Sequence, residues 1–174
     1  EARGVPTTVD FFGEKCAQTM LKNHGKAKVI IGNNVVAHID DKHDLMRGIT
    51  SLLAEDGVFI FEAPYLVDMF ENLAYDTIYH EHVCYLAIRP LQRLCEQFGM
   101  EIFDIALQNT QGTSIRVFTA RKGTRQVMPV IAELVSRELA LGMNTIAAYR
   151  KLAERIVASK RKLLGVLSDL KSLG

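Results

Sequence analysis

The chain has 174 residues, a formal net charge of +1 and 24% charged residues, which suits one domain with a sizeable core. This balance favours neither nucleic acid nor a membrane surface as a partner. No apolar run approaches the roughly 20 residues that span a bilayer, and the first residues lack the apolar stretch of a signal peptide. Cys16, Cys84 and Cys95 form no Cys-x-x-Cys pair, which favours reduced, buried thiols and a cytoplasmic location.

The first half of the chain alternates predicted helices and strands. Apolar spacing predicts a helix from residue 7 or 8 to residue 23, followed by a strand over residues 27–31 that is rich in β-branched side chains. We interpret this strand as buried and parallel. A second helix is predicted over residues 42–54 and a second strand over residues 58–62. Alternation of this kind indicates a parallel sheet covered by helices.

The middle of the chain is predicted to close this sheet. It contains a short helix over residues 64–73, a helix over residues 90–98, and strands over residues 101–107 and 114–120. The link between the two strands, residues 108–113, is short and polar. The strands are therefore expected to form an antiparallel pair, which makes the fold a mixed α/β sheet.

After residue 122 the sequence becomes helical in composition. Apolar residues recur at helical spacing between residues 127 and 170, although Gly142 and Gly165 weaken a single continuous helix. Two helices and one long bent helix both remain open. We therefore divide the chain into residues 1–122, an α/β unit, and residues 123–174, a helical extension that could pack on its own domain or form a homodimer.

Polar residues follow both predicted parallel strands. Asn33 and Asn34 come directly after the first strand, and Glu62 ends the second. Ligands of open α/β sheets bind in the crevice outside such strand ends. Asparagine also suits tight turns, and Glu62 could face either solvent or a pocket. Arg116 could lie near an anionic group or project from the polar side of its strand.

The densest cluster of proton-transfer groups is the segment Tyr79-His80-Glu81-His82. Either imidazole could take a proton from a carbon acid, since histidine titrates near neutral pH. Glu81 could orient a neighbouring ring, and Tyr79 could donate to a developing oxyanion. Two other interpretations stay open: a metal site in which His80, His82 and Cys84 share one face of an extended segment, and a purely structural polar loop.

Four motifs, in this order, resemble one known family: Asn33-Asn34-Val35-x-Ala37-His38, Gly57-Val58-Phe59-x-Phe61-Glu62-x-Pro64-Tyr65-Leu66, Tyr75-Asp76-Thr77-Ile78-Tyr79-His80-Glu81-His82 and Gly112-x-Ser114-x-Arg116. The family is that of the bacterial sugar C-methyltransferases, which act on nucleotide-linked 4-keto-6-deoxy sugars with S-adenosylmethionine. The similarity extends over residues 4–119. It implies a partial class I methyltransferase sheet, Rossmann-like, whose parallel strands close with an antiparallel hairpin before a long helical C-terminal segment.

The resemblance also implies roles for individual residues. His82 resembles the general base that removes the C3 proton of the sugar, after which the enolate carbon attacks the sulfonium methyl group. Tyr79, Glu81 and His38 resemble residues that surround the sugar and stabilise or relay charge. The cofactor is expected beside the motif Asn33, Asn34 and Val35. We expect substrate contacts from four further side chains: Glu62, Tyr65, His80 and Arg116.

Parts of the family's architecture have no expected counterpart here. The family has a cysteine-ligated zinc region, a class I domain and a second Rossmann-like domain. This sequence contains no Gly-x-Gly, Gly-Lys-Ser or Gly-Lys-Thr turn and begins with a helix. We therefore expect a fragment without zinc ligands, the cofactor loop or the last domain, which binds S-adenosylmethionine poorly and is inactive alone. The alternatives are an O- or N-methyltransferase on the same scaffold and a non-catalytic assembly module.

Overall fold

The computed structural model describes residues 4–109 and 112–173. Within these residues four strands form one sheet in the order β1-β2-β4-β3. The strands are β1 (Ala27–Asn33), β2 (Leu53–Pro64), β3 (Met100–Gln108) and β4 (Ser114–Arg121). β1 and β2 run parallel, whereas β4 is antiparallel to both β2 and β3. The predicted α/β fold and its closing hairpin are thus confirmed. Thr110 and Gln111, in the predicted link between β3 and β4, lie outside the described residues.

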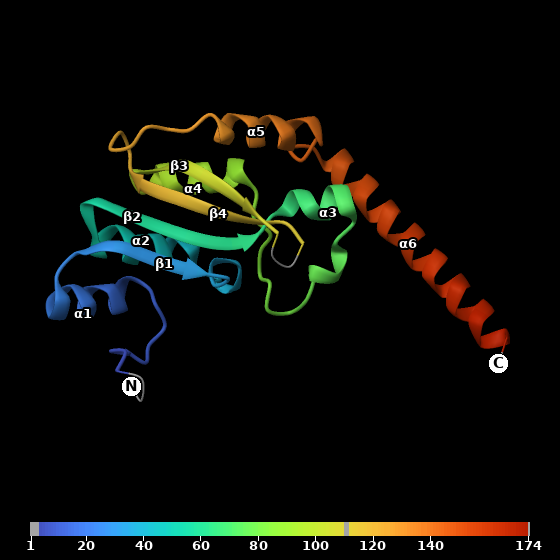
Figure 1. The fold of residues 1–174 in the computed structure, drawn as a ribbon, viewed down its shortest axis with the longest axis horizontal. Coiled ribbons are helices and arrows are strands. Elements are labelled where there is room, and N and C mark those ends of the chain that lie inside the picture. The colour runs from blue at the N-terminus through green and yellow to red at the C-terminus, as the bar shows by residue number, and fades with distance from the viewer. Residues whose placement is uncertain (1–3, 110–111, 174) are drawn as a thin grey trace.

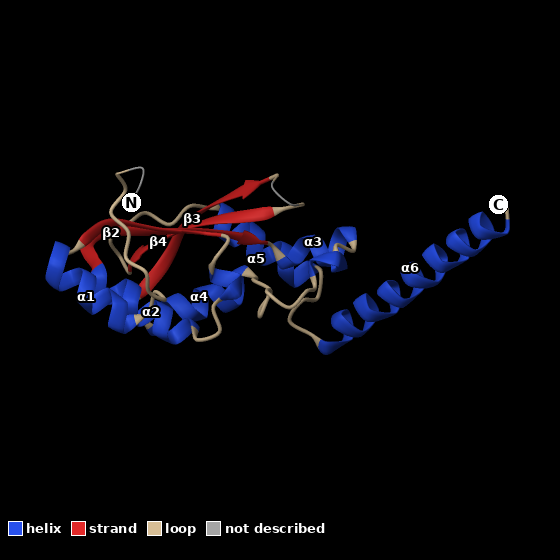
Figure 2. Cartoon of the chain, turned by 90° about the horizontal axis from the view of Figure 1, so that it is seen from below, coloured by secondary structure: helices blue, strands red, loops and turns tan. Residues whose placement is uncertain are grey.

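Helices cover one face of this sheet. The long helices are α1 (Glu14–His24), α2 (Lys42–Leu52), α4 (Ile88–Gln97), α5 (Val130–Ala140) and α6 (Ile146–Ser172), and the short ones are α3 (Leu66–Asn72), η1 (Val36–His38) and η2 (Tyr75–Thr77). Figure 2 shows α1, α2 and α4 beneath the strands, while α5 packs against β3 and α4. α6 projects away from the body (Figure 1).

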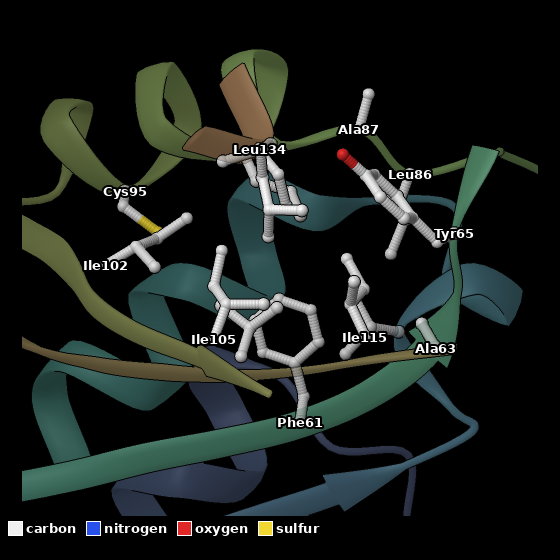
Figure 3. Packing of buried hydrophobic residues seen from close by; sticks show 14 of the residues in the cluster. Phe61, Ala63, Tyr65, Leu86, Ala87, Cys95, Ile102, Ile105, Ile115 and Leu134 are labelled. Atoms are coloured by element: carbon white, nitrogen blue, oxygen red, sulfur yellow. The ribbon is translucent and has the colours of Figure 1, made fainter. Parts of the chain in front are cut away.

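The core lies between the sheet and these helices. Phe59, Phe61 and Ala63 alternate along β2 and are almost fully buried, because every second side chain of a strand faces the same side. They pack with Ile115 of β4 and Leu134 of α5 in one apolar cluster (Figure 3). The cluster holds α4 against β2. It thereby positions the loops at the ends of these two elements.

Two predicted element boundaries are corrected by the structure. The first helix begins at Glu14 rather than near residue 8, since the Asp10 side chain accepts a hydrogen bond from the Phe11 N–H and Gly13 is extended. Such local side-chain bonds compete with helix formation. β2 begins at Leu53, inside the predicted helix over residues 42–54, because Leu53 is fully buried and pairs with Ala27 of β1.

The expectation that β1 is buried is also wrong for this chain. β1 is parallel to β2, as predicted, but it lies at the edge of the sheet. Val29 and Ile31 point away from the helices and are 54% and 64% exposed. Parallel strands are normally covered on both faces. β1 has the apolar composition of such a strand, but the described residues leave one of its faces exposed.

The C-terminal segment forms two helices, which decides between the two open alternatives. Gly142, with a φ of +69°, stands between α5 and α6. Gly165 lies inside α6 without interrupting it. Thr145 caps α6 by accepting a hydrogen bond from the Ala148 N–H. Of the helices in the described part of the chain, none is long and apolar enough to cross a membrane.

Candidate active site

Three charged or polar residues form a row across the C-terminal ends of the parallel strands. Asn33 of β1 lies beside Glu62 of β2, which lies beside Arg116 of β4. Glu62 is buried, and its Oε2 accepts hydrogen bonds from Arg116 Nε at 3.1 Å and Nη2 at 2.9 Å. A paired, largely buried carboxylate of this kind holds the strand ends in register. Glu62 therefore faces a partner in the sheet rather than free solvent.

The turn after β1 brings the first histidine to this edge. Asn34 adopts a φ of +51°, and its N–H donates to the Glu62 carbonyl at 2.8 Å. Asparagine tolerates this left-handed conformation better than most residues. The chain then enters η1, which ends at His38. Asn33, Asn34 and Val35 are exposed at this turn, where the sequence predicted the cofactor.

His38, Tyr79 and His82 meet although they come from segments about forty residues apart in the numbering. The ring centroids of Tyr79 and His82 are 4.2 Å apart, and those of His38 and His82 are 5.0 Å apart. The segment is held against η1 because the Val83 N–H donates to the Ala37 carbonyl at 3.2 Å. These three rings form the candidate acid/base cluster.

Hydrogen bonds define the tautomer of both histidines in the cluster. His82 Nδ1 lies 2.8 Å from the Thr77 carbonyl oxygen, and His38 Nδ1 lies 2.8 Å from the Glu81 carbonyl oxygen. A carbonyl oxygen only accepts, so each Nδ1 carries the proton and each neutral ring keeps its lone pair on Nε2. The Tyr79 hydroxyl donates to His82 Nε2 at 3.0 Å. His82 is therefore oriented as a base at Nε2.

His80 and Glu81 do not join this cluster through their side chains. The His80 side chain is 89% exposed and lies 3.9 Å from a Glu81 carboxylate oxygen. Glu81 contributes its backbone carbonyl to His38 instead. The structure thus separates the two histidines that residue chemistry could not distinguish, because only His82 has a fixed ring and a directed lone pair.

Tyr65, which was predicted from the sequence to contact the substrate, also lies apart from the acid/base cluster. It is 2% exposed, and its hydroxyl donates to Glu138 Oε1 at 3.0 Å. Burial, followed by the charge of Glu138, raises the pKa of the Tyr65 hydroxyl. Figure 3 shows the ring among core residues. The structure therefore places Tyr65 in the core, where its hydroxyl is not available to a substrate in this conformation.

The arrangement of the segment differs from the extended metal site considered above. η2 and the turn in which the His82 N–H donates to the Tyr79 carbonyl fold the segment back on itself, so His80 and His82 do not share a face. The residues that the structure describes contain no group of three or more His, Cys, Asp and Glu side chains arranged to hold a metal ion.

Sequence reasoning missed three residues of this region: Thr77, Tyr85 and Glu138. Thr77 acts through its backbone, which leaves no signal in residue chemistry. Tyr85 places its ring edge-on to His82 at a centroid distance of 6.2 Å. Glu138 could have been found, because it continues the buried stripe of Ile131 and Leu134 at helical spacing, and a carboxylate on an apolar stripe needs partners.

Residues 4–105 match the family described as a methyltransferase domain, and residues 109–174 match the family described as a C-methyltransferase C-terminal domain. The first match covers more than half of the chain, so the chain belongs to the methyltransferase domain family. The second match corrects the expectation that the family's last domain has no counterpart in this chain. The predicted division at residue 122 stays a prediction.

One curated relative and one solved structure illustrate the similarity. The chain is 36% identical over 176 residues to the C-methyltransferase NovU of Streptomyces niveus, which covers 98% of this chain and 42% of that protein. The chain thus spans less than half the length of this relative. A SAM-dependent methyltransferase from Anabaena variabilis superimposes with a TM-score of 0.50 at 11% identity, over 70% of this chain and 62% of that one. At that identity the likeness supports the α/β fold alone.

Proposed function

We propose that the protein transfers a methyl group from S-adenosylmethionine to a substrate carbon that lies next to a ketone, at C3 of a nucleotide-linked 4-keto-6-deoxy sugar. The observation that carries the proposal is His82, whose Nδ1–H is held by the Thr77 carbonyl while Nε2 points to the Tyr79 hydroxyl. Methylation of carbon needs such a base, because a C–H carbon has no lone pair, whereas oxygen and nitrogen acceptors have one.

The chemistry follows from these two side chains. His82 Nε2 takes the C3 proton, and the C–H electron pair passes into an enolate with the C4 oxygen. When a substrate displaces the Tyr79 hydroxyl from His82 Nε2, this hydroxyl is free to donate a hydrogen bond to the C4 oxygen. Bound S-adenosylmethionine would supply an electrophilic methyl group, so the new carbon–carbon bond forms as the sulfur–methyl bond breaks. His38 lies beside His82 and would share the proton carried away from the sugar.

The residues present fit the cofactor on one side only. Asn33 and Asn34 expose amides at the end of β1, where polar parts of a bound cofactor lie in open α/β sheets. The sequence contains no glycine-rich turn, so the other side of a cofactor would need other residues.

Cys16, Cys84 and Cys95 are free thiols, in keeping with the proposed cytoplasmic location. Zinc, which the resemblance associates with the family, would need ligands other than those of this chain.

The proposal is tested by finding which atom of the substrate receives the methyl group. The full-length protein is incubated with S-adenosylmethionine carrying a 13C-labelled methyl group and a nucleotide-linked 4-keto-6-deoxy sugar, and the product is examined by NMR. Label on C3 is expected. Label on oxygen or nitrogen would contradict the proposal in favour of the alternative chemistries, and no transfer to any acceptor would favour a non-catalytic module.

A His82→Asn variant tests the base. We expect its turnover to fall by about 10²- to 10⁴-fold, the usual contribution of a positioned acid or base. Binding of S-adenosylhomocysteine, measured by calorimetry, should stay unchanged, since His82 is not assigned to the cofactor. A matched His24→Asn variant at the exposed end of α1 should keep full turnover. Full activity of His82→Asn would remove the assignment.

A further inference from the structure

A cavity outside the acid/base cluster lies between α4 and the turn that joins α5 to α6. It has a volume of about 640 Å³, and its lining includes Arg89 and Arg93 of α4 together with Asn144 and Tyr149. Tyr85 lines the same cavity. None of the functions proposed so far uses the two arginines.

The two guanidinium groups lack protein partners. Within residues 4–109 and 112–173, neither Arg89 nor Arg93 makes a side-chain hydrogen bond or an ion pair. Arg116, Arg121 and Arg137 by contrast each pair with a glutamate. Two unpaired arginines in one cavity are a receptor for a planar anion with several oxygen atoms.

The spacing of the two arginines along α4 favours a bound anion. They stand four residues apart on one side of the helix, where like charges repel. Arg89 is in the first turn, where the Glu138 carboxylate of α5 already supplies the anionic group that the positive end of the helix dipole favours. A bound anion would relieve the repulsion between the two guanidinium groups.

One carboxylate, that of Glu138, also lines the cavity and offsets part of the charge of the pair. Glu138 uses one carboxylate oxygen for the Tyr65 hydroxyl and the Ile88 N–H at 2.5 Å, and the other for the Arg89 N–H at 3.2 Å. The carboxylate therefore caps the backbone of α4. His43 Nε2 lies 3.1 Å from Gln97 Oε1. Two guanidinium groups and one carboxylate thus leave the lining of the cavity with an excess of positive charge.

The cavity also adjoins the proposed reaction centre. Tyr85, which forms part of its wall, places its ring edge-on to His82. A ligand anchored on the two arginines could therefore extend past Tyr85 toward His82. A nucleotide-linked sugar has this form, with a diphosphate joining its sugar to its nucleoside.

We propose that Arg89 and Arg93 bind the diphosphate of the nucleotide-linked substrate, with Asn144 and Tyr149 beside the nucleoside. This inference rests on the proposed function for the identity of the substrate, but it concerns a separate set of residues. It assigns specificity for a nucleotide-linked sugar over a free sugar to α4 rather than to the row of Glu62 and Arg116.

The test measures binding without turnover. Calorimetry of the full-length protein with UDP, dTDP and GDP should show binding of at least one nucleoside diphosphate, and inorganic pyrophosphate should compete with it. The double variant Arg89→Gln/Arg93→Gln should weaken that binding by about tenfold or more, since each charge-assisted hydrogen bond to phosphate is strong. The matched double variant Arg161→Gln/Lys162→Gln removes the same charge from the exposed part of α6 and should bind as the unmodified protein does.

The outcomes separate this inference from the proposed function. His82→Asn should retain nucleoside diphosphate binding while losing turnover, and Arg89→Gln/Arg93→Gln should raise KM for the nucleotide-linked sugar with kcat nearly unchanged. The inference is overturned if no nucleoside diphosphate binds the unmodified protein, or if the arginine double variant binds within twofold of it. Either result would leave the carbon-labelling test of methyl transfer unaffected.

Discussion

At the scale of single residues, backbone carbonyls decide what the two histidines can do. The Thr77 and Glu81 carbonyls hold the Nδ1–H of His82 and His38, so both rings keep the same tautomer. The Tyr79 hydroxyl then has one basic nitrogen to donate to. A hydrogen bond to the second ring nitrogen commonly sets the function of a histidine in this way. His80, whose side chain is 89% exposed and whose Nε2 lies 3.9 Å from a Glu81 carboxylate oxygen, has no comparable constraint.

A Tyr79→Phe variant follows from this geometry. Removing the hydroxyl leaves His82 Nε2 free but takes away the group that would donate to the enolate oxygen. We expect kcat to fall by about 10²-fold, as for loss of one oxyanion donor, while KM changes little. Steady-state kinetics measures this, and Tyr75→Phe serves as the comparison. A kcat equal to that of the unmodified protein would show that the hydroxyl has no part in catalysis.

At the scale of elements, one buried carboxylate joins three of them. Glu138 of α5 accepts hydrogen bonds from Tyr65 at the end of β2 and from the first two N–H groups of α4. Those N–H groups have no partner inside the helix itself. Glu138 thereby couples the C-terminal helices to the loop that carries the acid/base cluster, since Leu86 pairs with Tyr65 just after this loop.

A Glu138→Ala variant should destabilise the fold. It leaves the Tyr65 hydroxyl and two backbone N–H groups buried without partners, which should lower the free energy of unfolding by about 2–5 kcal/mol. Urea unfolding followed by circular dichroism measures this. Glu133→Ala, at an exposed position of the same helix, should change the free energy of unfolding by less than about 0.5 kcal/mol. Equal stability of the two variants would mean that Glu138 is dispensable.

At the scale of the whole molecule, two apolar surfaces have no covering partner in the described residues. One is the exposed side of β1, with Val29 and Ile31. The other lies on the projecting part of α6 (Figure 1), where Leu163, Leu167 and Leu170 share a stripe. The same helix is anchored at its start, because Leu152 is buried and Tyr149 packs edge-on against Phe70.

The predicted homodimer can be tested on this stripe. If two copies pair through α6, the double variant Leu163→Glu/Leu170→Glu should convert a dimer into a monomer, because two carboxylates would be buried in an apolar contact. Sedimentation velocity of the full-length protein measures the change. Arg161→Glu/Ser168→Glu, on the opposite side of the helix, should leave the dimer intact. A monomer before any substitution would contradict the prediction.

The sequence by itself determined the α/β class, the parallel pair β1 and β2, the antiparallel pair β3 and β4, and the segment that contains the acid/base cluster. These follow from local patterns: apolar periodicity, glycine positions and the clustering of ionisable residues. The beginning of β2 at Leu53 was decided by pairing with a distant strand, which local patterns do not contain.

Only the tertiary structure decided how the site is built. The preference for His82 over His80, which residue chemistry left open, depends on the Thr77 carbonyl and on the approach of η1. The burial of Tyr65 depends on Glu138, 73 positions away. The unpaired state of Arg89 and Arg93 depends on which elements surround α4. In each case the deciding partner comes from another segment, so its effect arises only when the chain folds.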